Sequence, residues 1–125
     1  MATPLVLVVD NEDGLLVLFA RLVQRLGCNV LQANQGQMAI DILQEQTPDL
    51  MILDLAMPQV SGFDVLRAIV DIPRLDAMRV MVLTATGPGP APEDVNHRVD
   101  AWVTKPVLPT IFIEEVESLL GLSDE

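Results

Sequence analysis

The sequence predicts an α/β fold in which helices cover both faces of a five-stranded parallel sheet. Short apolar runs alternate five times with segments of helical periodicity, and this alternation is typical of parallel strands joined by helical crossovers. In addition, four of the runs lead directly to a polar residue. In an open α/β sheet these strand ends are where ligands and chemistry gather.

The first half of the chain supplies three strands and two helices. Leu5–Val9 is a continuous, β-branched apolar run, typical of a strand covered on both faces. Apolar residues then recur at spacings of three and four until Gly27, which predicts a helix that Asp13 caps at its start. A second strand is expected over Asn29–Ala33, a second helix over Gln35–Gln46, and a third strand over Leu50–Leu53.

The second half repeats the pattern with one interruption. We expect a helix over Gly62–Asp71, strands over Arg79–Leu83 and Ala101–Thr104, and a last helix from about Leu108, begun near Pro109, to Leu120. Three prolines stand in the segment Gly87–Pro92, where they lack amide donors and push their preceding residues out of the α region. The fourth helix is therefore expected to be short, at most about two turns from Glu93.

Composition excludes several classes of function. The chain has 125 residues, half of them hydrophobic, and a net charge of −11. This charge argues against direct binding to nucleic acid or to anionic membranes and favours a basic protein partner or a metal ion. A single cysteine, Cys28, permits no intramolecular disulfide, and we see neither a signal peptide nor a membrane-spanning stretch. We expect a cytoplasmic protein.

The polar residues at the strand ends suggest one site. They are Asp10, Asp54, Thr84 and Lys105, each at the end of a different predicted strand. A carboxylate can attack phosphorus directly, while Mg²⁺, a lysine and a hydroxyl group can neutralise or bind the phosphoryl oxygens. Acid, acid, hydroxyl and amine at one sheet edge therefore indicate a site for a metal ion and a phosphoryl group.

Six short stretches carry a resemblance to a known family. They are Val8-Val9-Asp10, Pro48–Asp54, Met57-Pro58, Gly62, Leu83-Thr84-Ala85 and Thr104-Lys105-Pro106. In this order and at these strand ends, the chain resembles the receiver domain of two-component response regulators from Val6 to about Leu120. The resemblance implies one receiver domain over residues 1–125, with a core of about 5–121. It also implies a flavodoxin-like three-layer sandwich with strand order 2-1-3-4-5.

The resemblance also implies roles for individual residues. Asp54 corresponds to the phosphoacceptor, and Asp10, Asn11, Asp54 and the Ala56 carbonyl occupy the positions of the Mg²⁺ ligands. Thr84, Ala85 and Lys105 correspond to the phosphoryl-binding positions, and Lys105–Pro106 to a cis peptide bond. Thr84 and Trp102 stand at the switch positions, although Trp102 could equally be fixed packing.

The implied partner is a sensor histidine kinase or a phosphotransfer protein, which donates the phosphoryl group. Signalling would then change the face formed by the fourth helix, the fifth strand and the fifth helix. An effector domain or a weak homodimer could receive this change. The kinase, the output, the oligomeric state and whether the chain stands alone are left open by the sequence.

Two departures from the family pattern limit these expectations. Asn11 replaces the second of two adjacent acids, and loss of a unit charge at metal contact is worth up to about 4 kcal/mol at an effective dielectric near 20. We therefore expect weaker Mg²⁺ binding, unless Glu12 reaches inward to compensate. The proline-rich segment shortens the fourth helix, so dimerisation through that face should be weak.

Two other functions compete with the leading one. A degenerate receiver would act as a constitutive interaction module, which Asn11 and the proline-rich segment favour. A Mg²⁺-dependent phosphohydrolase with an aspartyl nucleophile would carry a second acid two residues after it, where this chain has Ala56. We therefore expect a phosphoacceptor that is not a turnover enzyme.

Overall fold

The structure is a computed structural model that describes residues 3–85 and 92–122. Strands and helices alternate along the chain as predicted. The strands are β1 (Leu5–Val9), β2 (Asn29–Ala33), β3 (Leu50–Asp54), β4 (Arg79–Thr84) and β5 (Ala101–Thr104). The helices are α1 (Asp13–Arg25), α2 (Gly36–Glu45), α3 (Gly62–Val70), α4 (Glu93–Asn96) and α5 (Pro109–Leu120), with an unpredicted 3-10 helix at Pro73–Leu75.

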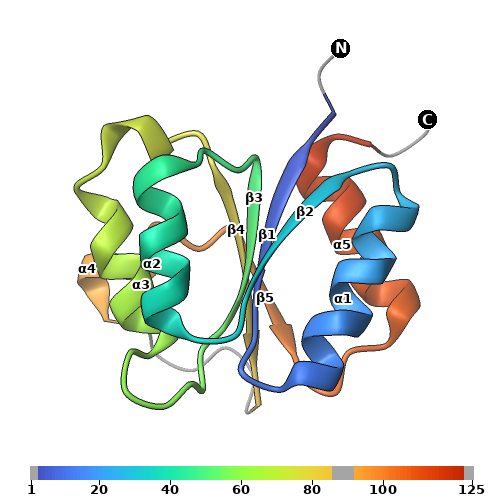
Figure 1. Cartoon of the computed structure of the whole chain (residues 1–125), viewed down its shortest axis with the longest axis horizontal. Helices are drawn as coiled ribbons and strands as arrows, with labels where there is room; N and C mark the ends of the chain where they lie inside the picture. Colours follow the sequence, from blue (N-terminus) through green and yellow to red (C-terminus); the bar gives the residue numbers. More distant parts are fainter. Residues whose placement is uncertain (1–2, 86–91, 123–125) are drawn as a thin grey trace.

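The five strands form one parallel sheet in the order β2-β1-β3-β4-β5. Helices α1 and α5 cover one face, and α2, α3 and α4 cover the other (Figure 1). Each face has its own hydrophobic cluster, and every residue of the central strand β3 is buried. On the α1–α5 face, the rings of Phe19 and Phe112 stack with centroids 4.6 Å apart. The predicted flavodoxin-like three-layer sandwich is confirmed.

Strands β3 and β4 are each one residue longer than predicted. Asp54 pairs with Leu83 and Thr84 pairs with Thr104, so the ladders continue to these polar residues. Because backbone pairing holds both residues within strands, their side chains start from fixed positions rather than from loops. Asp10 instead follows β1 directly, and Lys105 follows β5.

The predicted capping role of Asp13 is wrong. Glu12 occupies the N-cap of α1 without a side-chain capping bond, and Asp13 is the first helical residue. The backbone amide of Glu12 donates to Asp10 Oδ1 at 2.9 Å, which fixes the chain just before the helix. The carboxylate of Asp13 still lies in the first turn, where negative charge interacts favourably with the helix dipole. After the helix, Gly27 has a φ of +90°, which suits the predicted stop.

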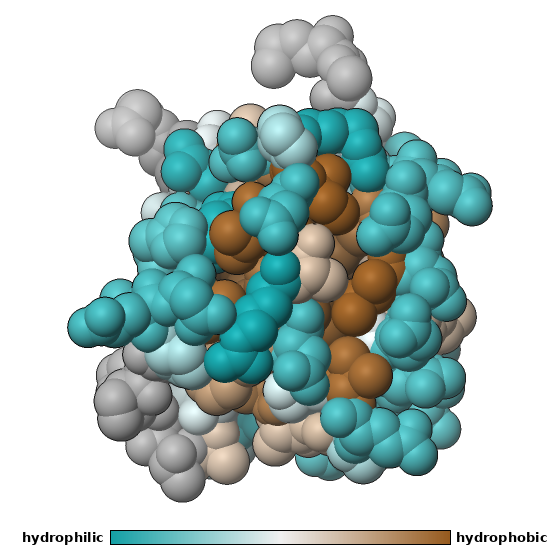
Figure 2. Space-filling view, turned by 90° about the vertical axis from the view of Figure 1, so that its left-hand side faces the viewer, coloured by the Kyte–Doolittle hydropathy of each residue, from teal (hydrophilic) through white to brown (hydrophobic). Residues whose placement is uncertain are grey.

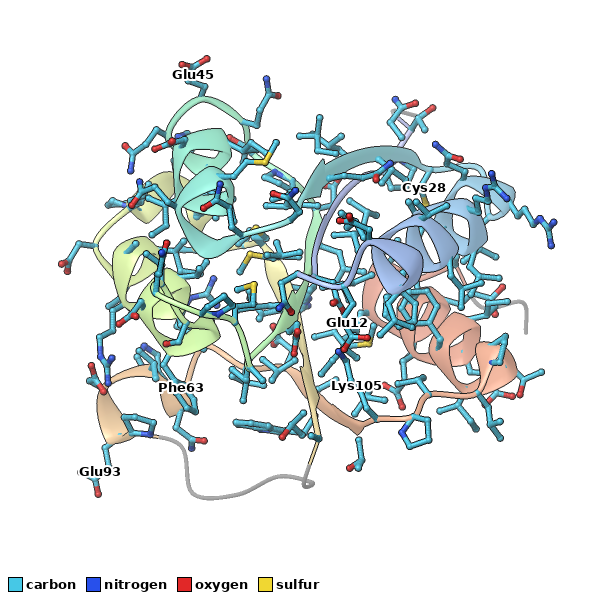
Figure 3. The ribbon with its side chains drawn as sticks, turned by 60° about the horizontal axis from the view of Figure 1, so that its bottom comes forward. Glu12, Cys28, Glu45, Phe63, Glu93 and Lys105 are labelled. Carbon is cyan, nitrogen blue, oxygen red and sulfur yellow. The ribbon has the colours of Figure 1, made fainter. Side chains whose placement is uncertain are left out.

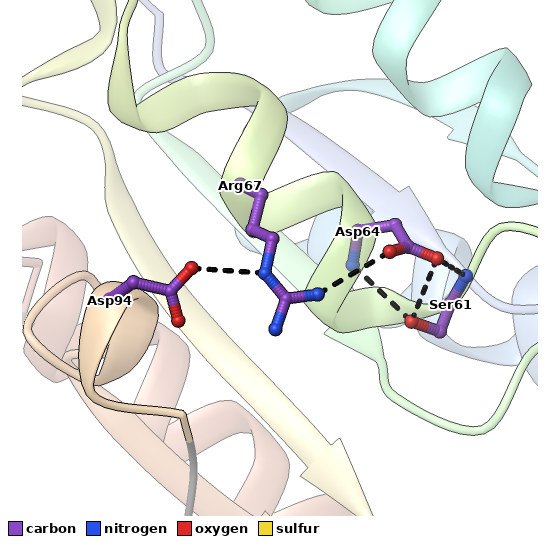
Figure 4. A network of polar contacts seen from close by, with 4 residues as sticks. All are labelled: Ser61, Asp64, Arg67 and Asp94. Carbon is purple, nitrogen blue, oxygen red and sulfur yellow. Dashed lines mark hydrogen bonds and ion pairs between the residues drawn. The ribbon is translucent and has the colours of Figure 1, made fainter.

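Helix α4 is as short as predicted, covering only Glu93–Asn96 after Pro92 at its N-cap. Residues 87–91 of the proline-rich segment lie outside the described residues. Val95 is fully buried, and Asp94 pairs with Arg67 of α3 at 3.0 Å (Figure 4). One buried valine and one exposed ion pair thus contribute to holding α4 against α3.

Helix α3 starts with a capping box, which Figure 4 shows in the same network. The Ser61 hydroxyl accepts from the Asp64 amide, and the Asp64 carboxylate accepts from the Ser61 amide at 2.9 Å. These hydrogen bonds from Ser61 hold the pKa of Asp64 below its usual value. The start of α3, and with it the end of the preceding loop, is therefore well fixed.

The outer surface over α2, α3 and α4 is mixed in character. Polar side chains cover most of it, with hydrophobic patches exposed between them (Figure 2). Met38 of α2, for example, is 42% exposed. In the described ranges of the chain, no helix has the length and apolar character needed to cross a membrane.

Candidate functional site

The buried polar groups of this protein gather at one edge of the sheet. In the described part of the chain, the buried polar or charged residues are Asp10, Asp54 and Thr84, with exposures of 0%, 3% and 8%. They stand at the carboxyl ends of β1, β3 and β4, which are neighbours in the sheet. Because burying polar groups is unfavourable without partners, their concentration here marks a built site.

Lys105 joins the two buried acids. Its ammonium Nζ lies 3.1 Å from Asp10 Oδ2 and 3.5 Å from Asp54 Oδ2. The backbone amide of Lys105 donates to the Thr84 carbonyl at 2.8 Å, and the Lys105–Pro106 peptide bond is cis. This residue is the only lysine in the sequence. Figure 3 shows its side chain at the same end of the molecule as Glu12.

The two carboxylates are held in the same way. One oxygen of each faces Lys105, and the other accepts from the backbone amide two residues later. Asp10 Oδ1 accepts from Glu12 at 2.9 Å, and Asp54 Oδ1 accepts from Ala56 at 3.1 Å. Both side chains are therefore oriented before any ligand binds.

Burial changes the acidity of Asp54. Desolvation raises its pKa, while the Lys105 ammonium and the Ala56 amide lower it, and the nearby charge of Asp10 raises it again. Desolvation outweighs the favourable contacts, so the pKa of Asp54 is above its usual value. A buried carboxyl group with a raised pKa and a specific cation beside it is a common feature of functional sites.

The loop after Asp54 lies close to the start of α3. A side chain at Gly62 would place its Cβ 2.8 Å from the Asp54 carbonyl oxygen and the Leu55 Cα, so this position requires glycine. The Gly62 amide donates to the Leu55 carbonyl at 3.2 Å, which closes the loop. This close approach gives a physical reason for glycine in the motif.

The donor set fits a hard divalent cation with few protein ligands. Within residues 3–85 and 92–122, no group of three His, Cys, Asp or Glu side chains could hold a metal. Asp10 and Asp54 nevertheless supply two carboxylates, and Mg²⁺ in proteins commonly uses one or two carboxylates and completes its shell with water. Asn11 and Ala56 are exposed beside these acids and offer neutral oxygens. The residues therefore fit Mg²⁺, with less negative charge than a pair of adjacent acids would provide.

Ala85 follows a strand that ends at this centre and Trp102 belongs to another, whereas Cys28 lies just before β2, at the opposite end of the sheet. Ala85 is exposed directly after β4. Trp102, in β5, is half-buried against the cluster on the α2–α3–α4 face. It also lines a surface pocket with Leu108 and Ile111. Cys28 is buried, and desolvation together with the charge of Asp49 raises the pKa of its thiol, as suits a structural cysteine.

An apolar pocket of about 320 Å³ lies beside Lys105, and the sequence did not predict it. It is lined by Glu12, Leu15, Leu18, Phe19, Lys105, Pro106 and Val107. Helical periodicity alone assigns Leu18 to the core, whereas it is 40% exposed at this pocket.

Comparisons with known proteins agree with this fold. The family profile of the response regulator receiver domain matches residues 6–117. The polar-differentiation response regulator DivK of Brucella ovis is 29% identical over 120 residues, covering 95% of this chain and 98% of DivK. A CheY-like receiver domain protein from Methanospirillum hungatei JF-1 superposes with a TM-score of 0.85 at 25% identity, over 94% of both chains.

A second solved structure shows the same fold at lower identity. Vibrio cholerae chemotaxis protein CheY4 is 24% identical, with a TM-score of 0.82 over 95% of this chain and all of that one. The profile match covers most of the chain and every strand end of the site. The chain therefore belongs to the response regulator receiver domain family, the signalling modules of two-component systems.

Proposed function

We propose that this receiver domain accepts a phosphoryl group on Asp54 from a phosphohistidine of a sensor histidine kinase or phosphotransfer protein. The observation that carries the proposal is the environment of Asp54. Its carboxylate is buried at the end of β3, one oxygen is held by the Ala56 amide, and the other lies 3.5 Å from Lys105. A fixed carboxylate beside a cation is suited to attack a phosphorus atom and to retain the product.

In the proposed step, a carboxylate oxygen of Asp54 forms a bond to phosphorus while the bond between phosphorus and the histidine nitrogen breaks. The nitrogen keeps the bonding electron pair. Lys105 lies where its charge would face the phosphoryl oxygens, and the Thr84 hydroxyl is a donor for them at the neighbouring strand end. Bound Mg²⁺, held by Asp10, Asp54, the Ala56 carbonyl and the Asn11 amide oxygen, would neutralise part of the phosphoryl charge.

The proposed output follows from where these residues lie in the sheet. Thr84 ends β4, and Trp102 lies in the neighbouring strand β5, paired with Val82. A change at Thr84 would therefore reach the face formed by α4, β5 and α5. We propose that this face, with its short α4, binds an effector or forms at most a weak homodimer, which sedimentation with and without a phosphate mimic would measure.

The test of the central claim uses a small-molecule phosphodonor, Mg²⁺ and intact-mass spectrometry. Wild type should gain one phosphoryl group, Asp54→Ala should gain none, and Asp41→Ala should behave like wild type because Asp41 is exposed on α2. An adduct that persists in Asp54→Ala would disprove the assignment of Asp54.

A degenerate receiver is the second candidate, and Asn11 is the observation that favours it. Folded wild-type protein that takes no phosphoryl group at any Mg²⁺ concentration would support this candidate. We do not favour turnover of a phosphate ester, because Ala56 offers no acid two residues after Asp54. The proposal also places the protein in the cytoplasm, where the lone Cys28 needs no disulfide partner.

A further inference from the structure

We propose that Gly36, the first residue of α2, positions the phosphorylation loop. We define this loop as residues 55–61, between the phosphoacceptor strand β3 and α3. The inference rests on the proposed function, because it concerns how efficiently Asp54 and the Ala56 carbonyl are presented to Mg²⁺ and to the phosphodonor. Gly36 is neither one of the Mg²⁺ ligand positions nor one of the phosphoryl-binding positions. It belongs to α2, whereas the loop leads into α3.

The contact that carries the inference is between Gly36 and Val60. Gly36 is buried. A Cβ at this position would overlap the Val60 carbonyl oxygen and lie 2.7 Å from Val60 Cγ1. Part of this obstruction is backbone, which cannot rotate away as a side chain can. The start of α2 therefore lies directly against the backbone of the phosphorylation loop.

The loop has little freedom to absorb a displacement at Val60. Beside it, Gln59 has a φ of +65°, an uncommon conformation that surrounding contacts must maintain. On the other side, the capping box fixes Ser61 at the start of α3. Movement of Val60 would therefore pass back along the loop rather than forward into α3.

The other end of the loop holds the functional groups. The Ala56 amide donates to Asp54 Oδ1 at 3.1 Å, and the Met57 amide donates to the Leu55 carbonyl at 3.1 Å. A shift that reaches Ala56 would change both the hydrogen bond to Asp54 and the direction of the Ala56 carbonyl. We infer that the missing side chain of Gly36 keeps these groups in place.

The chain supplies a matched control in Gly14. It is also within the first turn of a helix, α1, but a Cβ there would meet no atom within 4 Å. Gly36→Ala and Gly14→Ala therefore make the same chemical change at comparable helical positions, with and without contact to the loop.

Two measurements test the inference. Amide hydrogen exchange should show residues 55–61 less protected in Gly36→Ala than in wild type, with no such change in Gly14→Ala. With a small-molecule phosphodonor, the Mg²⁺ concentration that gives half the maximal phosphorylation rate should rise about tenfold in Gly36→Ala, the size expected when support of a metal ligand is lost. Gly14→Ala should match wild type.

The outcomes separate this inference from the proposed function. If Gly36→Ala unfolds more readily but keeps the wild-type Mg²⁺ dependence and loop exchange, Gly36 has only a packing role and the inference is wrong. If wild type takes no phosphoryl group, the proposed function fails, while hydrogen exchange still tests the positioning of the loop.

If Gly36→Ala does not fold, Val60→Ala tests the same contact from the other side. This change removes Cγ1 from Gly36 without adding volume, so it should also reduce protection of residues 55–61 and raise the Mg²⁺ requirement. Val17→Ala, at an exposed position of α1, is its control. A wild-type result for Val60→Ala would then overturn the inference.

Discussion

Replacing Lys105 with methionine should destabilise the protein more than loss of any exposed ion pair. Methionine keeps much of the length of the side chain and removes its charge. The two carboxylates that now face the ammonium, those of Asp10 and Asp54, would remain buried with only their backbone hydrogen bonds. Their mutual repulsion would no longer be offset.

The expected size follows from the two distances. At 3.1 Å and 3.5 Å, each attraction is worth about 5 kcal/mol at an effective dielectric of about 20. Removing the lysine also removes the unfavourable desolvation of its own charge, since its side chain is only 17% exposed. The net loss in the free energy of unfolding should therefore be about 3–5 kcal/mol, as for other broken buried ion pairs.

Urea unfolding near pH 7 would measure this loss. Arg79→Met is the control, because Arg79 is 59% exposed at 3.6 Å from Asp100 and its ion pair should contribute less than about 1 kcal/mol. Adding Asp54→Asn to Lys105→Met should recover about 1 kcal/mol or more, because one buried charge is removed. If Lys105→Met lowers the free energy of unfolding by less than about 1 kcal/mol, this prediction is wrong. The ion pairs of Lys105 would then contribute no more than solvent-exposed ion pairs do.

Three further predictions concern stability and metal binding. Asp54→Asn should raise the free energy of unfolding by about 0.5–2 kcal/mol at about pH 8. Burial raises the pKa of Asp54 above its ordinary value of 3.8, so ionisation of Asp54 opposes folding. The gain in stability should therefore shrink as the pH falls through the raised pKa and vanish below the ordinary value. Arg74→Met should lower the free energy of unfolding by about 1–2 kcal/mol in urea, because Arg74 donates to the Leu43, Gln44 and Gln46 carbonyls at the end of α2. A change as small as that of Arg79→Met would contradict this role. Asn11→Asp should bind Mg²⁺ more tightly in a titration followed by Trp102 fluorescence, and equal affinity would mean that another group already supplies the charge.

The fold was accessible from the sequence because each element has a strong local signal. The run Leu5–Val9 becomes β1 with the predicted bounds, since a continuous apolar run suits a strand buried on both faces. Prolines predicted the short α4 because they remove amide donors. Strand order was implied by the family resemblance, and periodicity alone does not determine it.

Contacts across the fold carry no local signal. Their strand ends predicted that Lys105 and Asp10 share one site, but across 95 residues no spacing rule predicts the hydrogen bond between them. The contact between Gly36 and Val60 joins a helix to a loop of another crossover, so Gly36 appeared only as a residue inside a predicted helix. The cap of α1 was misassigned because Asp10 holds the Glu12 amide, and this hydrogen bond depends on where β1 ends.

We propose that Asn11 and Gly36 act on the same property of the site, its requirement for Mg²⁺. Two carboxylates and one ammonium leave the unphosphorylated site with a single net negative charge, whereas an acid at position 11 would double it. The missing charge is worth at most about 4 kcal/mol, or up to about three powers of ten in affinity before solvent reduces the effect. The orientation of the Ala56 carbonyl, which we assign to Gly36, then becomes a larger share of the binding that remains. Phosphorylation of this chain should therefore be graded by Mg²⁺ over concentrations that would saturate an otherwise identical receiver with two acids, and the Asn11→Asp variant should lose that graded response.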